Sequence, residues 1–237
     1  MAYKFLLGLV VMMGLAWESG AADTPTALAR LAAAGGGKIL FLGNSITRHG
    51  PKADIGWTNN WGMAATALEK DFVHLLAADI ARLVGKQPQL QVTSLVDFER
   101  GYTSFDIPVK TKPLAEFKPD LIILAIGENT PALNDTAAKA AYKDCLVRLL
   151  KALKQNGDPA IFVRSCFWAN QAKDDALCAA AAETGCVFVD ISALAKVEAN
   201  YARSEQKLKS AGVAAHPGDR GMRAIAEALC AALKSQK

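Results

Sequence analysis

The sequence predicts an α/β protein built around a doubly wound sheet of five parallel strands. Five short segments are rich in Ile, Leu, Val or Phe and end at turn residues, as strands of a parallel sheet covered on both faces require. The expected strands are residues 38–42, 90–96, 121–126, 160–163 and 187–189. Helical stretches alternate with them, and this alternation implies right-handed crossovers that place helices on both faces of the sheet.

Three stretches carry apolar residues at the spacing of an amphipathic helix. They cover residues 68–83, 142–153 and 222–229. The chain has 237 residues, of which 51% are hydrophobic and 21% charged, and this composition suits one globular domain with a large core. We therefore expect a single domain over residues 23–237.

Residues 1–22 resemble an export signal. Lys4 supplies a positive start, residues 5–17 are an apolar run, and the small residues 19–22 suit cleavage. The alternative is an uncleaved membrane anchor, although the run is shorter than the ~20 apolar residues of a membrane-spanning helix. The leader predicts a secreted or periplasmic protein that is free of the membrane once the signal is cleaved.

Composition and motifs also exclude some functions. A net charge of +4, from 27 basic and 23 acidic residues, with no basic run interleaved with aromatics, argues against a nucleic-acid partner. No expected strand is followed by G-x-G-x-x-G or G-x-x-x-x-G-K-[ST], which argues against a nucleotide-binding domain. The five cysteines lack the spacing of a zinc site. A Cys178–Cys186 disulfide and five separate thiols both remain open.

In a doubly wound sheet the functional crevice lies at the carboxyl ends of the strands. Ser45 follows the first strand within Gly43-Asn44-Ser45-Ile46-Thr47, a strand-to-helix turn that would expose a nucleophilic hydroxyl. Its backbone N–H would also point into the site and could hold a developing oxyanion. The alternative role for Ser45 is a helix N-cap.

Two later turns supply further hydrogen-bond donors. Gly101 follows the second strand and can bring a bare N–H close to a ligand, and Asn129 follows the third strand with a side-chain amide. Each alone is an ordinary turn residue. Together with the N–H of Ser45 they outline an oxyanion hole.

A serine nucleophile also needs a base, and the chain has three histidines. His216 lies in the polar, glycine-bearing loop 216–222 that opens the last helix. His74 lies off the apolar stripe of its helix, and His49 is a close sequence neighbour of Ser45. We therefore expect His216 to act as the base.

These four segments together resemble the SGNH, or GDSL-type, hydrolase family. Residues 43–47 are similar to its nucleophile block, Gly101 matches the glycine of its second block, residues 127–129 are similar to its G-x-N block, and His216-Pro217 resembles its last block. The resemblance implies an esterase with a flavodoxin-like three-layer αβα sandwich. It implies no metal or organic cofactor.

The sequence departs from the family pattern at two positions. Thr130 follows Asn129 where the family usually has aspartate, and Val213 occupies the position of the acid three residues before the histidine. Such an acid orients the imidazole and stabilises the imidazolium. In its absence a Ser45/His216 dyad, a backbone carbonyl near Val213, or the carboxylate of Asp219 remain as alternatives. Asp219 is also placed to cap the last helix.

A polar loop after Ser45 is expected to hang over the site. It offers amides, a carboxylate and indole rings that suit a sugar, and the candidate substrate-binding residues are His49, Asp54, Trp57, Asn60 and Trp61. Alternatively, the two tryptophans pack the loop onto the sheet.

The sequence thus predicts an exported serine esterase. It would remove a small acyl group, such as acetyl, from a carbohydrate or another small ester through an acyl-enzyme on Ser45. The alternative, motivated by Val213, is a noncatalytic carbohydrate-binding protein that retains the hydrolase fold. The sequence gives no oligomeric state.

Overall fold

A computed structural model of the chain describes residues 25–155 and 157–236. Its centre is a sheet of five parallel strands in the order β2-β1-β3-β4-β5, which is the flavodoxin-like order of a doubly wound fold. The strands are β1 (Lys38–Gly43), β2 (Gln89–Ser94), β3 (Leu121–Ala125), β4 (Ala160–Arg164) and β5 (Val187–Val189). The predicted three-layer α/β fold is confirmed.

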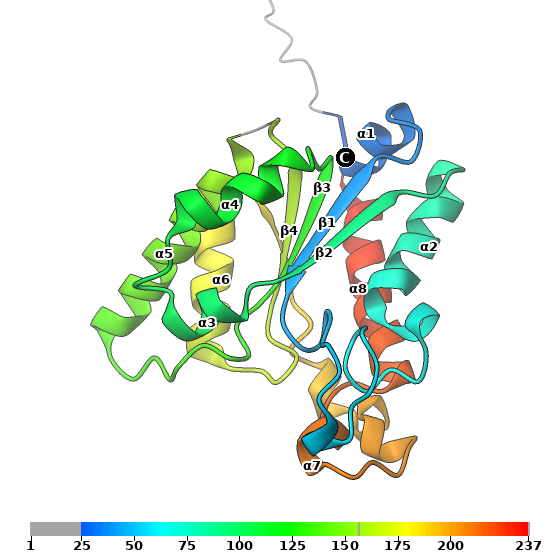
Figure 1. The fold of residues 1–237 in the computed structure, drawn as a ribbon. Helices are drawn as coiled ribbons and strands as arrows, with labels where there is room; N and C mark the ends of the chain where they lie inside the picture. Colours follow the sequence, from blue (N-terminus) through cyan, green and yellow to red (C-terminus); the bar gives the residue numbers. More distant parts are fainter. Residues whose placement is uncertain (1–24, 156, 237) are drawn as a thin grey trace, which may run out of the picture.

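Helices cover both faces of the sheet (Figure 1). One face carries α1 (Ala27–Ala33), α2 (Phe72–Val84) and α8 (Asp219–Ser235). The other carries α3 (Val96–Gly101), α4 (Ile107–Glu116), α5 (Thr136–Lys154) and α6 (Gln171–Glu183). A short helix, α7 (Ala211–Ala214), lies beyond the carboxyl ends of the strands, and the 3₁₀ helices are Ala53–Ile55, Leu68–Lys70, Leu194–Lys196, Glu198–Asn200 and Ala202–Ser204.

The core is divided by the sheet into two apolar layers. In β1 the side chains of Ile39 and Phe41 enter the layer under α2 and α8, whereas those of Leu40 and Leu42 enter the layer under α5. This division follows from the alternation of side chains along a strand. All four are fully buried, which explains why the strand has a continuous apolar sequence instead of an alternating one.

Some elements differ from the expected ranges. Strand β2 stops at Ser94, because Leu95 and the residues after it turn into α3. Helix α2 begins at Phe72, because the carboxylate of Asp71 accepts the N–H of His74 and caps the helix there. Helix α6 was not predicted: it buries mainly small side chains, such as Ala176 and Ala180, which leave a weak apolar stripe.

Of the two alternatives left open for the cysteines, the Cys178–Cys186 disulfide does not form, and all five thiols are free. Cys178 is exposed on α6, whereas the Cys186 thiol contacts the hydroxyl of Thr184. The expected export signal lies outside the described residues. Within residues 25–155 and 157–236, no helix is both long and apolar enough to span a bilayer.

Candidate active site

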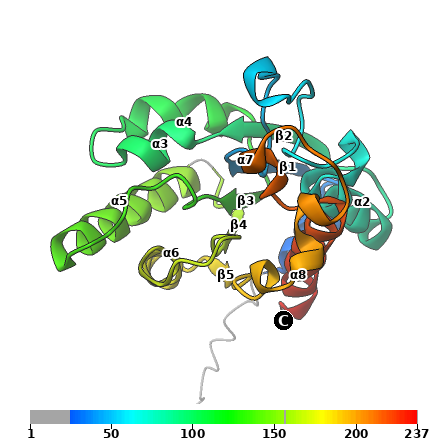
Figure 2. The same cartoon turned by 90° about the horizontal axis from the view of Figure 1, so that it is seen from below.

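A cavity of about 420 Å³ opens at the carboxyl ends of the strands. Ser45, Asn129 and His216 all line it, although they come from three distant parts of the sequence. Seen from below the sheet, α7 lies across the ends of β1 and β2, next to this edge (Figure 2). The topology therefore brings Ser45, Asn129 and His216 together, as the sequence predicts.

Ser45 lies in a tight turn at the end of β1. The carbonyl of Asn44 accepts the N–H groups of Thr47 and Arg48, and the carbonyl of Ser45 accepts the N–H of Met63. Gly43 is required before this turn, because an added Cβ would lie 1.8 Å from the hydroxyl oxygen of Thr47. The turn leaves the hydroxyl of Ser45 directed at His216.

Ser45 and His216 are in direct contact. The Oγ of Ser45 lies 2.9 Å from the Nε2 of His216, and the Nδ1 of His216 lies 2.8 Å from the carbonyl oxygen of Gly212. Because a carbonyl can only accept, Nδ1 carries the proton of the neutral ring and Nε2 is left to accept the hydroxyl proton of Ser45. This tautomer is the one that a general base needs.

The environment of His216 keeps the ring neutral. Burial lowers the pKa of His216 below its ordinary value, and His49 acts in the same direction, whereas the Gly212 carbonyl and Glu128 oppose them. The indole of Trp168 packs edge-on against the imidazole, with ring centroids 5.1 Å apart. A neutral imidazole fixed on two sides is ready to take a proton near neutral pH.

Asp219 does not orient His216, because its carboxylate contacts other residues. Its carboxylate accepts the N–H and hydroxyl of Thr66 and pairs with Lys70. It lies in the first turn of α8, where a negative charge also stabilises the helix. The ring is held by the carbonyl of Gly212 instead, and Val213 is buried in a small apolar cluster.

The oxyanion-hole residues differ in their placement. Among the described residues no protein group accepts the N–H of Ser45. The side-chain Nδ2 of Asn129 donates one hydrogen to Glu99, which leaves its second hydrogen for a ligand in the cavity that it lines. These two donors are therefore available to a developing oxyanion.

Gly101, in contrast, does not line the cavity. It is the last residue of α3, where backbone N–H groups donate to carbonyls four residues earlier in the helix. The reason is that β2 ends early and α3 starts at Val96, so Gly101 lies more than a helical turn beyond the strand end. Ser94 and Val96 line the cavity in that region.

A network of buried charges that the sequence analysis did not identify lies beneath Ser45. The side-chain amide of Asn44 donates to both Glu99 and Glu128, at 3.0 and 2.7 Å. Glu99 also accepts the backbone N–H groups of Gly127 and Asn129, and Glu128 pairs with the buried Arg164 at 2.7 Å. The network thus fixes the turns that carry Ser45 and Asn129.

The two carboxyl groups have opposite pKa shifts. Burial, together with the charge of Glu128, raises the pKa of Glu99. Burial also disfavours the charged form of Glu128, but Arg164 and the N–H of Phe167 outweigh it, so the pKa of Glu128 is lowered. Glu99 receives only N–H donors in the structure, and this arrangement fits its ionised form.

The loop after Ser45 places only one of its five candidate residues in the cavity. His49 lines it. Trp57 is buried and donates to the carbonyl of His49, while Trp61 packs edge-on against Trp57 and donates to Ala65. The tryptophans therefore hold the loop down, which was the alternative prediction. The two polar candidates contact cations of the same loop: Asp54 pairs with Lys52 and Asn60 accepts from Arg48.

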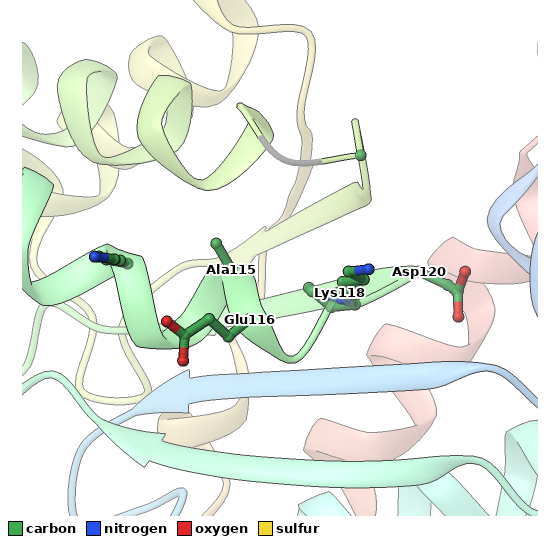
Figure 3. A pocket seen from close by; sticks show the side chains of 7 residues that line it. Ala115, Glu116, Lys118 and Asp120 are labelled. Atoms are coloured by element: carbon green, nitrogen blue, oxygen red, sulfur yellow. The ribbon is translucent and has the colours of Figure 1, made fainter.

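A larger cavity of about 620 Å³ lies at the other end of the sheet, near the amino end of β3. Figure 3 shows Glu116, Lys118 and Asp120 around it, from α4 and the segment that leads into β3. The carboxylate of Asp120 accepts the N–H of Lys38. None of the serine or histidine residues discussed above lines this cavity, so volume alone does not locate the chemistry.

No protein-family model and no curated protein sequence matches the chain. Solved structures do resemble it. A GDSL-like lipase from Bacteroides ovatus superposes with a TM-score of 0.51 at 11% identity, covering 84% of this chain and 99% of that one. A second GDSL-like lipase, from Bacteroides uniformis, gives 0.51 at 13% identity, with 84% and 96% covered.

A carbohydrate esterase whose active site has catalytic and non-catalytic binding functions also superposes with a TM-score of 0.51. The identity is 15%, and the match covers 84% of this chain and 69% of that one. At such low identity the superpositions show the fold alone. The chain therefore has the SGNH/GDSL-type hydrolase fold.

Proposed function

We propose that the chain is a serine esterase that hydrolyses a small acyl ester, with Ser45 as nucleophile and His216 as general base. The observation that carries this proposal is the 2.9 Å contact between the Oγ of Ser45 and the Nε2 of His216. A nucleophile in contact with a base that is itself oriented by a third group is the signature of covalent catalysis. Here the third group is the carbonyl of Gly212.

The reaction proceeds in two halves. Ser45 attacks the ester carbonyl while His216 takes its proton, and the resulting oxyanion is held by the N–H of Ser45 and the free amide hydrogen of Asn129. Collapse of the intermediate breaks the ester bond, and His216 returns the proton to the departing alcohol. His216 then takes a proton from water, which attacks the acyl-enzyme. The bond between the acyl carbon and the Oγ of Ser45 breaks, His216 returns the proton to this oxygen, and the carboxylic acid is released.

For the substrate we propose an acetyl or similarly small acyl ester, borne by a carbohydrate. A cavity of about 420 Å³ suits a ligand of that size. One of the structures with the same fold is a carbohydrate esterase. Action outside the cytoplasm is part of the proposal and rests on the apolar leader at residues 5–17.

A second candidate function is noncatalytic binding of a carbohydrate in the same cavity. It is favoured by one observation, the buried Val213 at the position where an acid would support His216. A carbonyl can fix the tautomer, but it carries no full negative charge to stabilise the imidazolium. The two functions make different predictions for the reactivity of Ser45.

Organophosphate labelling and ester hydrolysis test the proposal together. The purified protein should be labelled at Ser45 and should release nitrophenol from 4-nitrophenyl acetate. The Ser45→Ala variant should lose the label and at least about 10⁴-fold in turnover, because the nucleophile is gone. Ser235→Ala, at the far end of α8, serves as the matched control. An unlabelled, inactive protein that binds oligosaccharides would instead support noncatalytic binding.

A further inference from the structure

We propose that the ester substrate carries an anionic group, a carboxylate, sulfate or phosphate, which is recognised by Arg48, Lys52 and Arg100 at the mouth of the Ser45 cavity. This inference rests on the proposed esterase function and specifies its substrate class. The three cations line the same cavity as Ser45 and His216. They come from two elements, since Arg48 and Lys52 belong to the loop after β1 and Arg100 belongs to α3.

The composition of the cavity lining is one-sided. Three cationic side chains line it, and the described residues contribute no Asp or Glu to it. The complete lining is Ser45, Arg48, His49, Lys52, Ile55, Met63, Ser94, Val96, Arg100, Asn129, Ser210, Gly212, Val213 and His216. A cleft lined by one sign of charge concentrates ligands of the opposite sign. A neutral ester gains nothing from this arrangement.

The two arginines have no anionic partner within the described residues. The Nε of Arg48 donates to the amide oxygen of Asn60 at 3.0 Å and one terminal nitrogen makes a long contact of 3.5 Å with the carbonyl of Val92, so the remaining guanidinium donors have no partner among the described residues. The guanidinium of Arg100 makes no hydrogen bond to any described residue. Free guanidinium groups bind carboxylate, sulfate or phosphate oxygens through two parallel bonds.

Lys52 is paired only weakly. Its Nζ lies 3.6 Å from Asp54, and both side chains are more than half exposed. Exposed pairs of this kind contribute little and exchange readily for a ligand. Lys52 can therefore add a third positive charge when an anionic substrate enters the cavity.

The buried carboxylates below the cavity do not neutralise the cations at its mouth. The oxygens of Glu99 accept amide hydrogens of Asn44, Gly127 and Asn129, and Glu128 is neutralised by Arg164. These carboxylate oxygens already accept hydrogen bonds from groups beneath Ser45. The cations at the mouth are left to an anion that enters from solvent.

Two pairs of esters that differ in one charge test the inference. The first pair, 4-nitrophenyl acetate and 4-nitrophenyl hydrogen succinate, places the charge on the acyl side. The second pair, acetylated methyl galactoside and acetylated methyl galacturonate, places it on the alcohol side. In one pair, the ratio of kcat/KM for the anionic over the neutral ester should be about tenfold. The pair that shows it identifies which side of the ester bears the anion.

The variants Arg48→Gln and Arg100→Gln should each lower that ratio severalfold, and 0.5 M NaCl should lower it as well. The matched control is Lys86→Gln, an exposed cation before β2 that does not line the cavity and should leave the ratio unchanged. Ratios near one in both pairs, or ratios that neither arginine variant alters, would overturn the inference while leaving the esterase proposal intact.

A binding measurement covers the case in which the protein hydrolyses no ester. Calorimetry would then compare galacturonate oligomers with neutral galactose oligomers on the unmodified protein. Preferential binding of the galacturonate, lost in Arg100→Gln and retained in Lys86→Gln, would support the anion site although the esterase proposal had failed. Equal binding of the two, or binding of neither, would overturn it.

Discussion

In the described part of the chain, charged groups are paired in the floor of the cavity, which we define as Glu99, Glu128 and Arg164, and unpaired at its mouth, which carries Arg48 and Arg100. Under Ser45 the charged groups are buried and paired, with Glu128 bound to Arg164 and Glu99 surrounded by N–H donors. At the mouth, Arg48 and Arg100 are exposed and face solvent without an anionic partner among the described residues. The floor is thus built to hold positions, whereas the mouth keeps charge available for a ligand.

The difference follows from solvent. A buried charge is costly unless it is paired and hydrogen-bonded, so the floor tolerates its carboxylates only as members of a network. Cations at the mouth remain hydrated and need no partner to be stable. Substitutions in the floor should therefore affect folding, whereas substitutions at the mouth should affect substrate choice.

The largest effect is expected from Glu128→Gln. Among the residues that the structure describes, Glu128 is the carboxylate that pairs with the fully buried Arg164, so this change leaves an uncompensated charge in the core. The free energy of unfolding, measured by urea denaturation, should fall by about 3–5 kcal/mol. The reason is the lost pairing of Arg164, since glutamine nearly preserves the shape of the side chain.

The matched control is an ion pair of the same length on the surface. Arg203 and Glu198 are also 2.7 Å apart but largely exposed, so Glu198→Gln should change stability little. If the two variants were equally stable, the floor would not depend on its charge network, and the contrast between floor and mouth would fail.

The sequence predicted the parts of the site that depend on strand ends. Ser45 and Asn129 lie in the turns after β1 and β3, and parallel strands bring their carboxyl ends together whatever the side chains are. Gly101 was placed by the same reasoning but is absent from the cavity lining, because β2 ends at Ser94 and a helix intervenes. A short helix directly after a strand gives no clear periodic signal.

The charge network could not be predicted, because its members meet only in three dimensions. Asn44 contacts Glu99 and Glu128 from 55 and 84 positions away. A glutamate in a turn or an arginine at a strand end is usually exposed, and only the packing around it shows otherwise. The Gly212 carbonyl differs in this respect, because it agrees with the sequence-based alternative of a backbone carbonyl near Val213.

The pH dependence of hydrolysis should give the next largest effect. His216 must be neutral to accept the proton of Ser45, and burial lowers its pKa below 6.5. For a neutral ester, kcat/KM should therefore be half-maximal below pH 6.5, nearly constant above pH 7, and fall about tenfold per pH unit below the midpoint. Circular dichroism at each pH separates this fall from acid unfolding.

The pH profile distinguishes a carbonyl from a carboxylate as the hydrogen-bond partner of the Nδ1 of His216. A carboxylate partner would favour the imidazolium and raise the pKa of the ring. Opposing influences on the ring are already present, since Glu128 raises its pKa while His49 lowers it. A midpoint at or above pH 7 would contradict the conclusion that burial is the main influence on the pKa of His216. It would indicate that a carboxylate reaches the ring in solution.

The smallest effect is expected from Asp219→Asn. The Asp219 carboxylate contacts Thr66 and Lys70, and the orientation of His216 depends on Gly212. The kcat/KM of the variant for 4-nitrophenyl acetate should therefore stay within about twofold of the parent, whereas loss of a true triad acid costs about 10⁴-fold in a serine protease. Lys70→Gln removes the same ion pair from its other side and serves as the control. A fall of a hundredfold in Asp219→Asn alone would show that the carboxylate swings to His216 during catalysis, and the site would then be a triad that assembles only with substrate.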